Sequence, residues 1–360
     1  MIRRWTLNRY FLGRFLASFG STLIGVFALA YLIDMIEISR RGRFDDIGFG
    51  TIAIISALRV PGFIEQAFPF VILFTSLFTL AQLNKRMELV VSRAAGVSIW
   101  QILTPFMAGS FLIGALAVAA YNPLAALAQS YSASLETMVA GESASDSERA
   151  RWLRQSGGGI DSIIGARAIS NGGAELGGVT AFVLNSEGTV RERIDAQRAT
   201  LIDGSWLIDR PTVTRVGYPP EERASAMLPT TLLPEYIEQR LSDPQTVSVW
   251  ALWSKIEVAR ALGYDSAAFS MRFHSLIAMP ALFMAMTLVA GTVAVRYSRV
   301  GQSGTTIVSG IAAGFVLYVV TFLAQALGSN AVVPAVAAAW FPVVAAGLFG
   351  TTILLHQEDG

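Results

Sequence analysis

The sequence predicts a helical membrane protein with about six transmembrane helices and an inserted, all-β, jelly-roll-like domain outside the cytoplasm. Apolar residues make up 53% of the chain and charged residues only 15%, and the mean hydropathy is +0.52. A water-soluble chain of this length needs more charge to cover its surface, whereas lipid-facing helices do not. A polar, glycine-rich stretch with short β-prone runs interrupts the apolar segments and predicts the inserted domain.

The apolar segments can be assigned to spans by length, since about 20 apolar residues are needed to cross the hydrocarbon core. Residues 47–83 are too long for one simple span, and Arg59 and Pro61 interrupt them. We therefore expect an interfacial helix over residues 47–60, followed by a span. The six predicted spans are residues 11–36, 63–83, 99–121, 273–295, 305–327 and 331–355.

The polar segment between the third and fourth spans contains regularly spaced short strands, which indicates a sandwich or jelly roll. Its clearest hairpin covers residues 199–208, where Asp203 and Gly204 suit a two-residue type I′ turn. A helix over residues 246–262 is expected to lead the chain back to the membrane. The register of the turn pairs Leu201 with Trp206, Ala199 with Ile208, and Arg198 with Asp209.

This order of segments predicts three parts of the chain. They are residues 1–125 with three spans and a cytoplasmic helix at about residues 84–97, residues 126–262 as the β domain, and residues 263–360 with three more spans.

Basic residues in the short connections predict the orientation, because lysine and arginine concentrate on the cytoplasmic side. They fall near the amino end and after the second and fourth spans, so both termini are expected inside and the β domain outside. The connection after the first span breaks this rule. It carries Arg40, Arg41 and Arg43, only partly offset by Asp45 and Asp46.

Composition also excludes several kinds of chemistry. The chain has no cysteine, only two histidines and a net charge of +1, so disulfides, thiolate metal sites and a nucleic-acid signature are not expected. Lys85 and Lys255 are its only lysines, and neither follows a phosphate-binding glycine loop. The amino-terminal apolar stretch is too long for a cleavable signal peptide. We therefore expect no cofactor in this chain.

The connection between the second and third spans predicts a short amphipathic helix. Its apolar positions share helical spacing, and Gly96 suits the helix end. Such a helix either docks into the groove of a partner or lies on lipid headgroups with its charges in water. The apolar positions are Met87, Val90, Val91, Ala94 and Ala95.

Residues 83–98, Leu-Asn-Lys-Arg-Met-Glu-Leu-Val-Val-Ser-Arg-Ala-Ala-Gly-Val-Ser, resemble the same connection in the LptF/LptG family of lipopolysaccharide export permeases. The opening residues 8–10, the order of three spans, domain and three spans, and Pro280 in the fourth span are also similar to that family. The resemblance covers nearly the whole chain and fits LptG better than LptF, although the LptF-like paralogue stays open. The β domain resembles the family mainly in type and position.

The resemblance implies a permease subunit of an ABC transporter in the bacterial inner membrane. Such a permease extracts lipopolysaccharide and passes it to a periplasmic bridge of jelly-roll domains. The implied partners are a second LptF/LptG-type permease, a homodimeric cytoplasmic ATPase (LptB-like) that binds the ATP and Mg²⁺, a bitopic jelly-roll protein (LptC-like) and a periplasmic bridge protein (LptA-like).

The resemblance also implies roles for particular residues. Glu88 would be the carboxylate that meets a basic residue of the ATPase, assisted by Arg86 and by the apolar Met87, Val90 and Val91. Arginine binds phosphate well, so Arg40, Arg41, Arg43 and Arg59 are candidates for the lipopolysaccharide headgroup. Snorkelling, or pairing with Asp45 and Asp46, is the alternative. Relatives often carry lysine where this chain has Asp34 and Gly62, which weakens the headgroup assignment.

The first and fifth spans would line the lipid cavity of this family. Gly310 and Gly314 form a small-residue pair that marks either the seam with the partner permease or packing inside this chain. Asp34, near the outer end of the first span, either senses a ligand or reaches interfacial water. The candidates for acyl-chain contact, which alternatively face lipid or pack internally, are Phe27, Tyr31, Phe315, Tyr318 and Phe322.

Other function classes remain as alternatives. A membrane-embedded enzyme would need paired catalytic groups at one depth, and a secondary transporter would need midplane charge or broken helices in both halves. A non-transporting mechanotransmission or scaffold permease typically carries four spans and a larger domain, so the number of spans distinguishes it.

Overall fold

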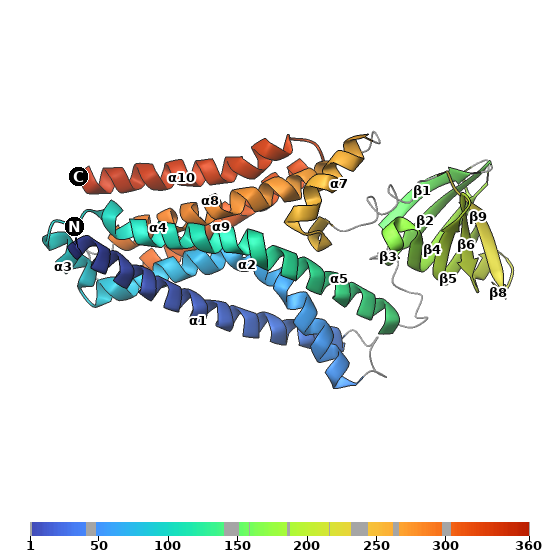
Figure 1. Cartoon of the computed structure of the whole chain (residues 1–360), viewed down its shortest axis with the longest axis horizontal. Coiled ribbons are helices and arrows are strands. Elements are labelled where there is room, and N and C mark those ends of the chain that lie inside the picture. The colour runs from blue at the N-terminus through green and yellow to red at the C-terminus, as the bar shows by residue number, and fades with distance from the viewer. Residues whose placement is uncertain are drawn as a thin grey trace. The chain divides into compact units, whose positions relative to one another are not determined.

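The computed structural model describes residues 2–40, 48–139, 151–157, 159–185, 188–215, 217–231, 244–261, 266–296 and 304–359 (Figure 1). The chain divides into two compact units. One is a helical unit made of Met1–Asp34, Arg59–Leu127 and Val247–Gly360, and the other contains the strands and is made of Met35–Leu58 and Ala128–Thr246.

Six helical segments of the described residues are long and apolar enough to cross a membrane, which confirms the predicted architecture. Six is also the number expected of the export permeases rather than of a four-span mechanotransmission protein. The segments are Thr6–Arg40, Phe49–Lys85, Ile99–Glu136, Ala267–Ala294, Gly310–Ser329 and Ala335–Gln357. The helices are α1 (Ile2–Arg40), α2 (Phe49–Lys85), α3 (Glu88–Ala94), α4 (Ile99–Leu116), α5 (Asn122–Val139), α7 (Val249–Ala261), α8 (Ala267–Arg296), α9 (Gly304–Ser329) and α10 (Ala335–Asp359).

The predicted interruption of the helix is wrong, because α2 runs through Pro61 and Pro69 as one helix. The boundary between the two compact units nevertheless falls inside α2, between Leu58 and Arg59, close to the predicted end of the interfacial part. A proline inside a membrane helix is tolerated where neighbouring groups satisfy the backbone. The Tyr121 hydroxyl donates a hydrogen bond to the carbonyl oxygen of Pro61 at 2.9 Å, which connects the third span to α2 beside this proline.

The third span is also longer than predicted. A π-helical turn, Ala117–Tyr121, joins α4 to α5, which continues to Val139. Ile38 of α1, Ile55 of α2 and Leu135 of α5 pack together, so the extensions of these helices share an apolar contact. The loss of hydropathy after residue 129 therefore reflects the polar face of a helix rather than the start of the strands.

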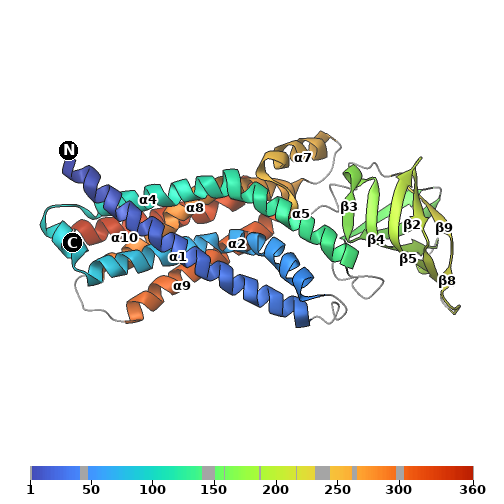
Figure 2. The same ribbon diagram turned by 60° about the horizontal axis from the view of Figure 1, so that its bottom comes forward.

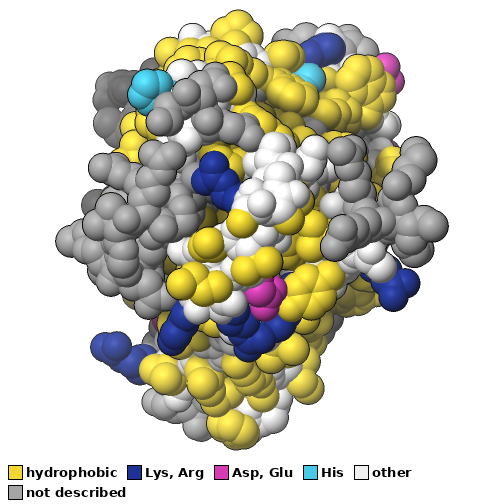
Figure 3. Space-filling model, turned by 90° about the vertical axis from the view of Figure 1, so that its left-hand side faces the viewer, with side chains coloured by type: hydrophobic (Ala, Val, Ile, Leu, Met, Phe, Trp, Pro, Cys, Tyr) yellow, Lys and Arg dark blue, Asp and Glu magenta, His cyan; other side chains and the backbone are white. Residues whose placement is uncertain are grey.

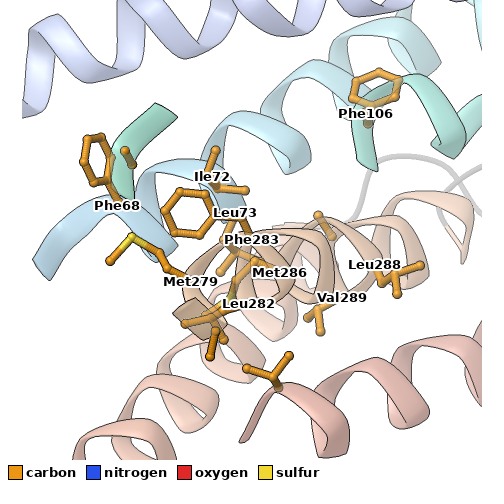
Figure 4. Close-up of a cluster of buried hydrophobic side chains, with 14 of the residues drawn as sticks. Phe68, Ile72, Leu73, Phe106, Met279, Leu282, Phe283, Met286, Leu288 and Val289 are labelled. Carbon is orange, nitrogen blue, oxygen red and sulfur yellow. The ribbon is translucent and has the colours of Figure 1, made fainter. Parts of the chain in front are cut away.

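The core of the helical unit forms where α2, α4 and α8 meet (Figure 4). Phe68 of α2 lies 6.0 Å, centroid to centroid, from Phe283 of α8. A Cβ on Gly114 would lie 2.6 Å from Cα of Pro280, so glycine allows α4 and α8 to approach closely.

In the described residues of the β domain, nine strands form one antiparallel sheet. The predicted hairpin is confirmed in every pair, with Leu201 opposite Trp206, Ala199 opposite Ile208 and Arg198 opposite Asp209. Asp203 and Gly204 have φ of 47° and 74°, as a type I′ turn requires. The strands are β1 (Arg151–Gly157), β2 (Ile160–Ala166), β3 (Ala168–Ser170), β4 (Glu175–Leu184), β5 (Val190–Ile202), β6 (Ser205–Asp209), β7 (Thr212–Arg215), β8 (Glu221–Glu222) and β9 (Ser225–Pro229).

β5 is shared by two parts of this sheet. Its first half, Glu192 to Asp195, pairs with β7, and its second half, Arg198 to Ile202, pairs with β6. Alternate residues of the strands point into one apolar core, where Trp206 is the largest fully buried side chain.

Candidate functional site

The short helix α3 begins and ends at strained or glycine positions. Met87 precedes it with φ 61°, a left-handed conformation that is uncommon for a residue with a side chain. Gly96 follows it with φ 81°. These two positions turn the chain sharply out of α2 and into α4, so α3 is held as a separate element. A helix with a glycine beyond its end is confirmed, but it covers only Glu88–Ala94 and not the predicted residues 84–97, so Met87 and Ala95 lie just outside it.

α3 is anchored on one side and open on the other. Leu89 is buried in the helical core at 7% exposure. Met87 and Val91 are 62% and 65% exposed, and Val90 is 39% exposed. Because nothing else in the described chain covers these apolar side chains, they form a patch that suits contact with another surface. We call Met87, Val90 and Val91 the α3 patch.

Charged residues flank the α3 patch. Glu88 lies in the first turn of α3, where the helix dipole favours a carboxylate, and it is half-buried. Lys85 and Arg86 are exposed immediately before it. Figure 3 views the end of the molecule that lies at the left of Figure 1, where α3 is found, and shows apolar and basic side chains with few acidic ones among the coloured residues. A carboxylate among cations next to an apolar patch is the chemistry of a docking site for a protein partner.

The ends of the chain lie near α3. Figures 1 and 2 place the start of α1, the end of α10 and α3 at one end of the helical unit, and α7 at its other end. An even number of spans requires both termini to be on one side of the membrane, and the arrangement fits that requirement.

Arg59, one of the residues predicted to bind the lipid headgroup, forms an ion pair inside the chain. Its Nη1 lies 3.6 Å from Oδ1 of Asp34, and the Asp34 side chain is only 3% exposed. The guanidinium carbon of Arg59 also lies 5.7 Å from the centre of the Phe63 ring. Asp34 is thus buried rather than open to interfacial water, and its partner is an arginine of α2.

The other predicted headgroup residues lie at or beyond the end of α1. Arg40 is the exposed last residue of that helix. Arg41 and Arg43 lie outside the described residues, as do Asp45 and Asp46.

The residues predicted to contact acyl chains divide into two groups. Phe27, Phe315 and Phe322 are 41%, 58% and 58% exposed, respectively. Tyr31 is partly buried against the core, and the Tyr318 ring packs against Phe70 in a tilted arrangement, with ring centres 4.7 Å apart. α1 and α9 therefore present exposed apolar and aromatic faces, while the two tyrosines pack inside the chain.

Gly310 and Gly314 pack inside this chain. A Cβ on Gly310 would lie 3.1 Å from Val293 of α8, and one on Gly314 would overlap the Leu73 side chain of α2. Of the two alternatives for this glycine pair, the structure shows the internal contact between α9 and its neighbours.

Sequence reasoning missed a buried polar cluster in the helical unit. Glu65 of α2, Asn122 of α5 and Arg272 of α8 are hydrogen-bonded together, with Glu65 at 4% and Asn122 at 0% exposure. Only the position of Glu65 inside an apolar segment was visible in the sequence. Its partners are far away along the chain, and no local pattern predicts which of them it meets.

Residues 9–356 match the profile of the family described as lipopolysaccharide export system permease LptF/LptG. The lipopolysaccharide export system permease protein LptG of Escherichia coli strain K12 is 23% identical over 351 residues, which cover 93% of this chain and 93% of that protein. LptG of Haemophilus influenzae is 25% identical over 369 residues, with 94% of each chain covered. The similarity therefore includes the helices at both ends of the sequence and the inserted β domain.

Proposed function

Because the chain belongs to the LptF/LptG family of lipopolysaccharide export permeases, we propose that it is a permease subunit of an ATP-driven transporter. The transporter extracts lipopolysaccharide from the inner membrane and passes it to a periplasmic bridge of jelly-roll domains. This chain supplies half of the membrane channel, most similar to LptG, and a second permease of the same family supplies the other half.

The α3 patch with Glu88 is the observation that carries this proposal. The sequence contains no phosphate-binding glycine loop, so the ATP and Mg²⁺ are bound by a separate, homodimeric cytoplasmic ATPase. The α3 patch enters a groove of that ATPase, and Glu88 meets a basic residue there. Leu89 fastens α3 to the helical core, so movement of α3 reaches the spans.

Charge gives the orientation of the transporter. Lys85, Arg86 and Arg93 all belong to the connection that contains α3, which assigns this end of the helical unit to the cytoplasm. Both termini then lie in the cytoplasm. The β domain follows three spans, an odd number, so it belongs to the periplasm.

The lipid path follows from the exposed faces of α1 and α9. Phe27, Phe315 and Phe322 are free of contacts that would bury them, and they can touch acyl chains between the two permeases. Arg40, Arg41 and Arg43 bind the anionic headgroup near the outer leaflet. Arg59 takes part only if the phosphate competes with Asp34, its partner in the structure.

Copurification tests this proposal. The chain carrying an affinity tag is isolated gently from the membranes of its native cells, and the proteins that copurify with it are identified by mass spectrometry. We expect a small ATPase and a second six-span permease to appear together, with a jelly-roll protein. If the purified chain never carries an ATPase, or if protease reaches the β domain from the cytoplasmic side, the proposal is wrong.

A further inference from the structure

The polar cluster of Glu65, Asn122 and Arg272 joins four helices of the helical unit. Nη2 of Arg272 in α8 donates a hydrogen bond to Oε1 of Glu65 in α2 at 2.7 Å. Nδ2 of Asn122 in α5 donates to the same oxygen at 3.1 Å. Oδ1 of Asn122 accepts a hydrogen bond from the backbone N–H of Val249 at 2.8 Å. Val249 is the first residue of α7, so one asparagine side chain connects α2, α5 and α7.

The local backbone places Asn122 at this point. The π-helical turn Ala117–Tyr121 ends at Asn122, whose backbone N–H bonds to the carbonyl oxygen of Ala117. Such turns are rare and occur often at functional sites. The first N–H groups of an α-helix have no partner within the helix, and the amide oxygen of Asn122 satisfies one of them in α7. Tyr121 adds a contact to α2 through the carbonyl oxygen of Pro61.

The cluster lies at the two places where the chain passes between the helical unit and the β domain. The chain leaves the helical unit for the β domain through α5 and returns through α7. The beginnings of α5 and α7 are therefore both bonded to this cluster. The cluster also contains Glu65 of α2 and Arg272 of α8, the helix that begins the second set of spans.

The cluster contains an ion pair rather than apolar side chains. This favours a role in fixing how the helices are arranged. Burying an ion pair is costly, and replacing it by apolar residues is often neutral for stability or even favourable. What a hydrogen-bonded charge supplies is direction, since each donor and acceptor fixes one distance and one angle. The cluster selects one arrangement of α2, α5, α7 and α8 among those that apolar contacts alone would allow.

We propose that Glu65, Asn122 and Arg272 are positioning residues that form the joint through which movement of the membrane helices reaches the β domain. The inference rests on the proposed function and adds to it the place where the spans are coupled to the transfer of lipopolysaccharide. When the joint is intact, a conformational change that begins at α3 moves α5 and α7 together. When it is loosened, the spans still move, but the β domain no longer follows them.

The first test compares two quantities in proteoliposomes that contain the whole transporter: ATP hydrolysis, and lipopolysaccharide delivered to a periplasmic acceptor. We expect Asn122→Ala and Glu65→Gln to hydrolyse ATP at nearly the wild-type rate, while lipopolysaccharide delivered per ATP falls on the order of tenfold. Ser110→Ala is the matched control, because it removes another buried polar contact between helices, to Thr287 at 2.6 Å, away from α5 and α7. Unchanged delivery per ATP in both joint variants would overturn the proposal.

A second measurement tests the joint without transport, so it separates a failed joint from a failed function. The chain has no cysteine, so spin labels can be placed at Leu124→Cys in α5 and Trp250→Cys in α7, both of which are exposed. We expect a narrow distribution of distances that broadens in Asn122→Ala and not in Ser110→Ala. Equal distributions would contradict the joint, whereas a wild-type assembly that delivers no lipopolysaccharide would contradict the proposed function alone.

Exchange of the charges gives a third criterion. Glu65→Arg and Arg272→Glu each place like charges together, and we expect either to abolish delivery. The double variant restores opposite charges in α2 and α8. It does not restore the hydrogen bond from Nδ2 of Asn122, because turning the amide oxygen toward the guanidinium would leave Nδ2 facing the N–H of Val249. Partial recovery of delivery per ATP is the expected result, and no recovery in a double variant that assembles normally would count against a directional joint.

Discussion

The helical unit and the β domain each bury a polar cluster, but the chemistry of the two clusters differs. In the β domain, Oε1 of Gln155 accepts hydrogen bonds from Nε1 of Trp206 at 3.2 Å and Oγ1 of Thr230 at 2.8 Å. Nε2 of Gln155 donates to Oγ of Ser162 at 3.1 Å. These four side chains are all neutral, whereas the cluster in the helical unit contains the charged pair Glu65 and Arg272.

The difference follows from how each region satisfies its backbone. Strands bond to neighbouring strands, so register already fixes the sheet, and the Gln155 cluster only needs to hold Trp206 in its core. Each membrane helix satisfies its own backbone, which leaves side chains to specify how helices meet. A hydrogen-bonded charge provides that specification most strongly. We therefore expect changes in the two clusters to differ in the size of their effect on stability.

Removing one member of the charged pair should have the largest effect on stability. In Arg272→Ala, Glu65 keeps a buried carboxylate with only Asn122 as a partner, and breaking a buried pair in this way costs about 3–5 kcal/mol. We expect a clear fall in the midpoint of thermal unfolding of the whole chain in detergent. A variant with both Glu65→Leu and Arg272→Leu should recover most of that loss, because no charge remains buried; equal loss in both would argue that packing alone is responsible.

The neutral cluster around Gln155 should contribute less to stability than the charged pair. Gln155→Leu keeps the volume of the side chain but leaves Nε1 of Trp206 without its acceptor, at a cost of about 1–3 kcal/mol. Hydrogen exchange of the β1 and β2 amides in the whole protein measures this loss. Arg154→Ala, next in the same strand, removes only an exposed ion pair with Asp161 and should change exchange little. Similar acceleration in the two variants would show that the Gln155 hydrogen bonds add nothing specific.

The smallest effect is expected from Glu192, a mostly buried carboxylate of the β domain whose two arginine partners are exposed. Burial opposes ionisation of Glu192, but hydrogen bonds from Arg191 and Arg215 outweigh it and hold the pKa below the ordinary value. Its stabilisation is therefore complete above the unfolded pKa of about 4.3 and is lost as the pH falls through the lower folded pKa. Since both arginine partners are exposed and water screens their charges, we expect less than about 1 kcal/mol. Glu192→Gln should flatten this part of the stability profile below pH 5; an unchanged slope would contradict the assignment.

Local patterns predicted the elements whose causes are local. Asp203 and Gly204 specify the turn of a hairpin, and the flanking strands then have one register. Hydropathy located the spans, and the spacing of Met87, Val90 and Val91 predicted α3 and its apolar side. In each case the deciding contacts lie within a few residues along the chain.

Features that depend on distant partners were not predicted. Pro61 reads as a break in the sequence, but α2 continues through it, and Tyr121 of the π-helical turn is hydrogen-bonded to α2 at that point. Arg59 reads as a free cation, but it pairs with Asp34 of another helix. The joint is formed by Glu65, Asn122 and Arg272, which lie on three different helices. Periodicity along a single helix cannot predict contacts between residues of different helices.

In the function proposed above, Glu88 on α3 transmits the work of a separate ATPase into the permease. The most direct measurement is ATP-driven release of lipopolysaccharide by the reconstituted transporter carrying Glu88→Ala, with Glu257→Ala as the control, since Glu257 is an exposed glutamate of another short helix. Loss of a desolvated charge contact costs about 2–5 kcal/mol, so we predict that the Glu88 variant inserts normally but no longer couples hydrolysis to release, while the control matches the wild type. Wild-type release per ATP in Glu88→Ala would contradict the account.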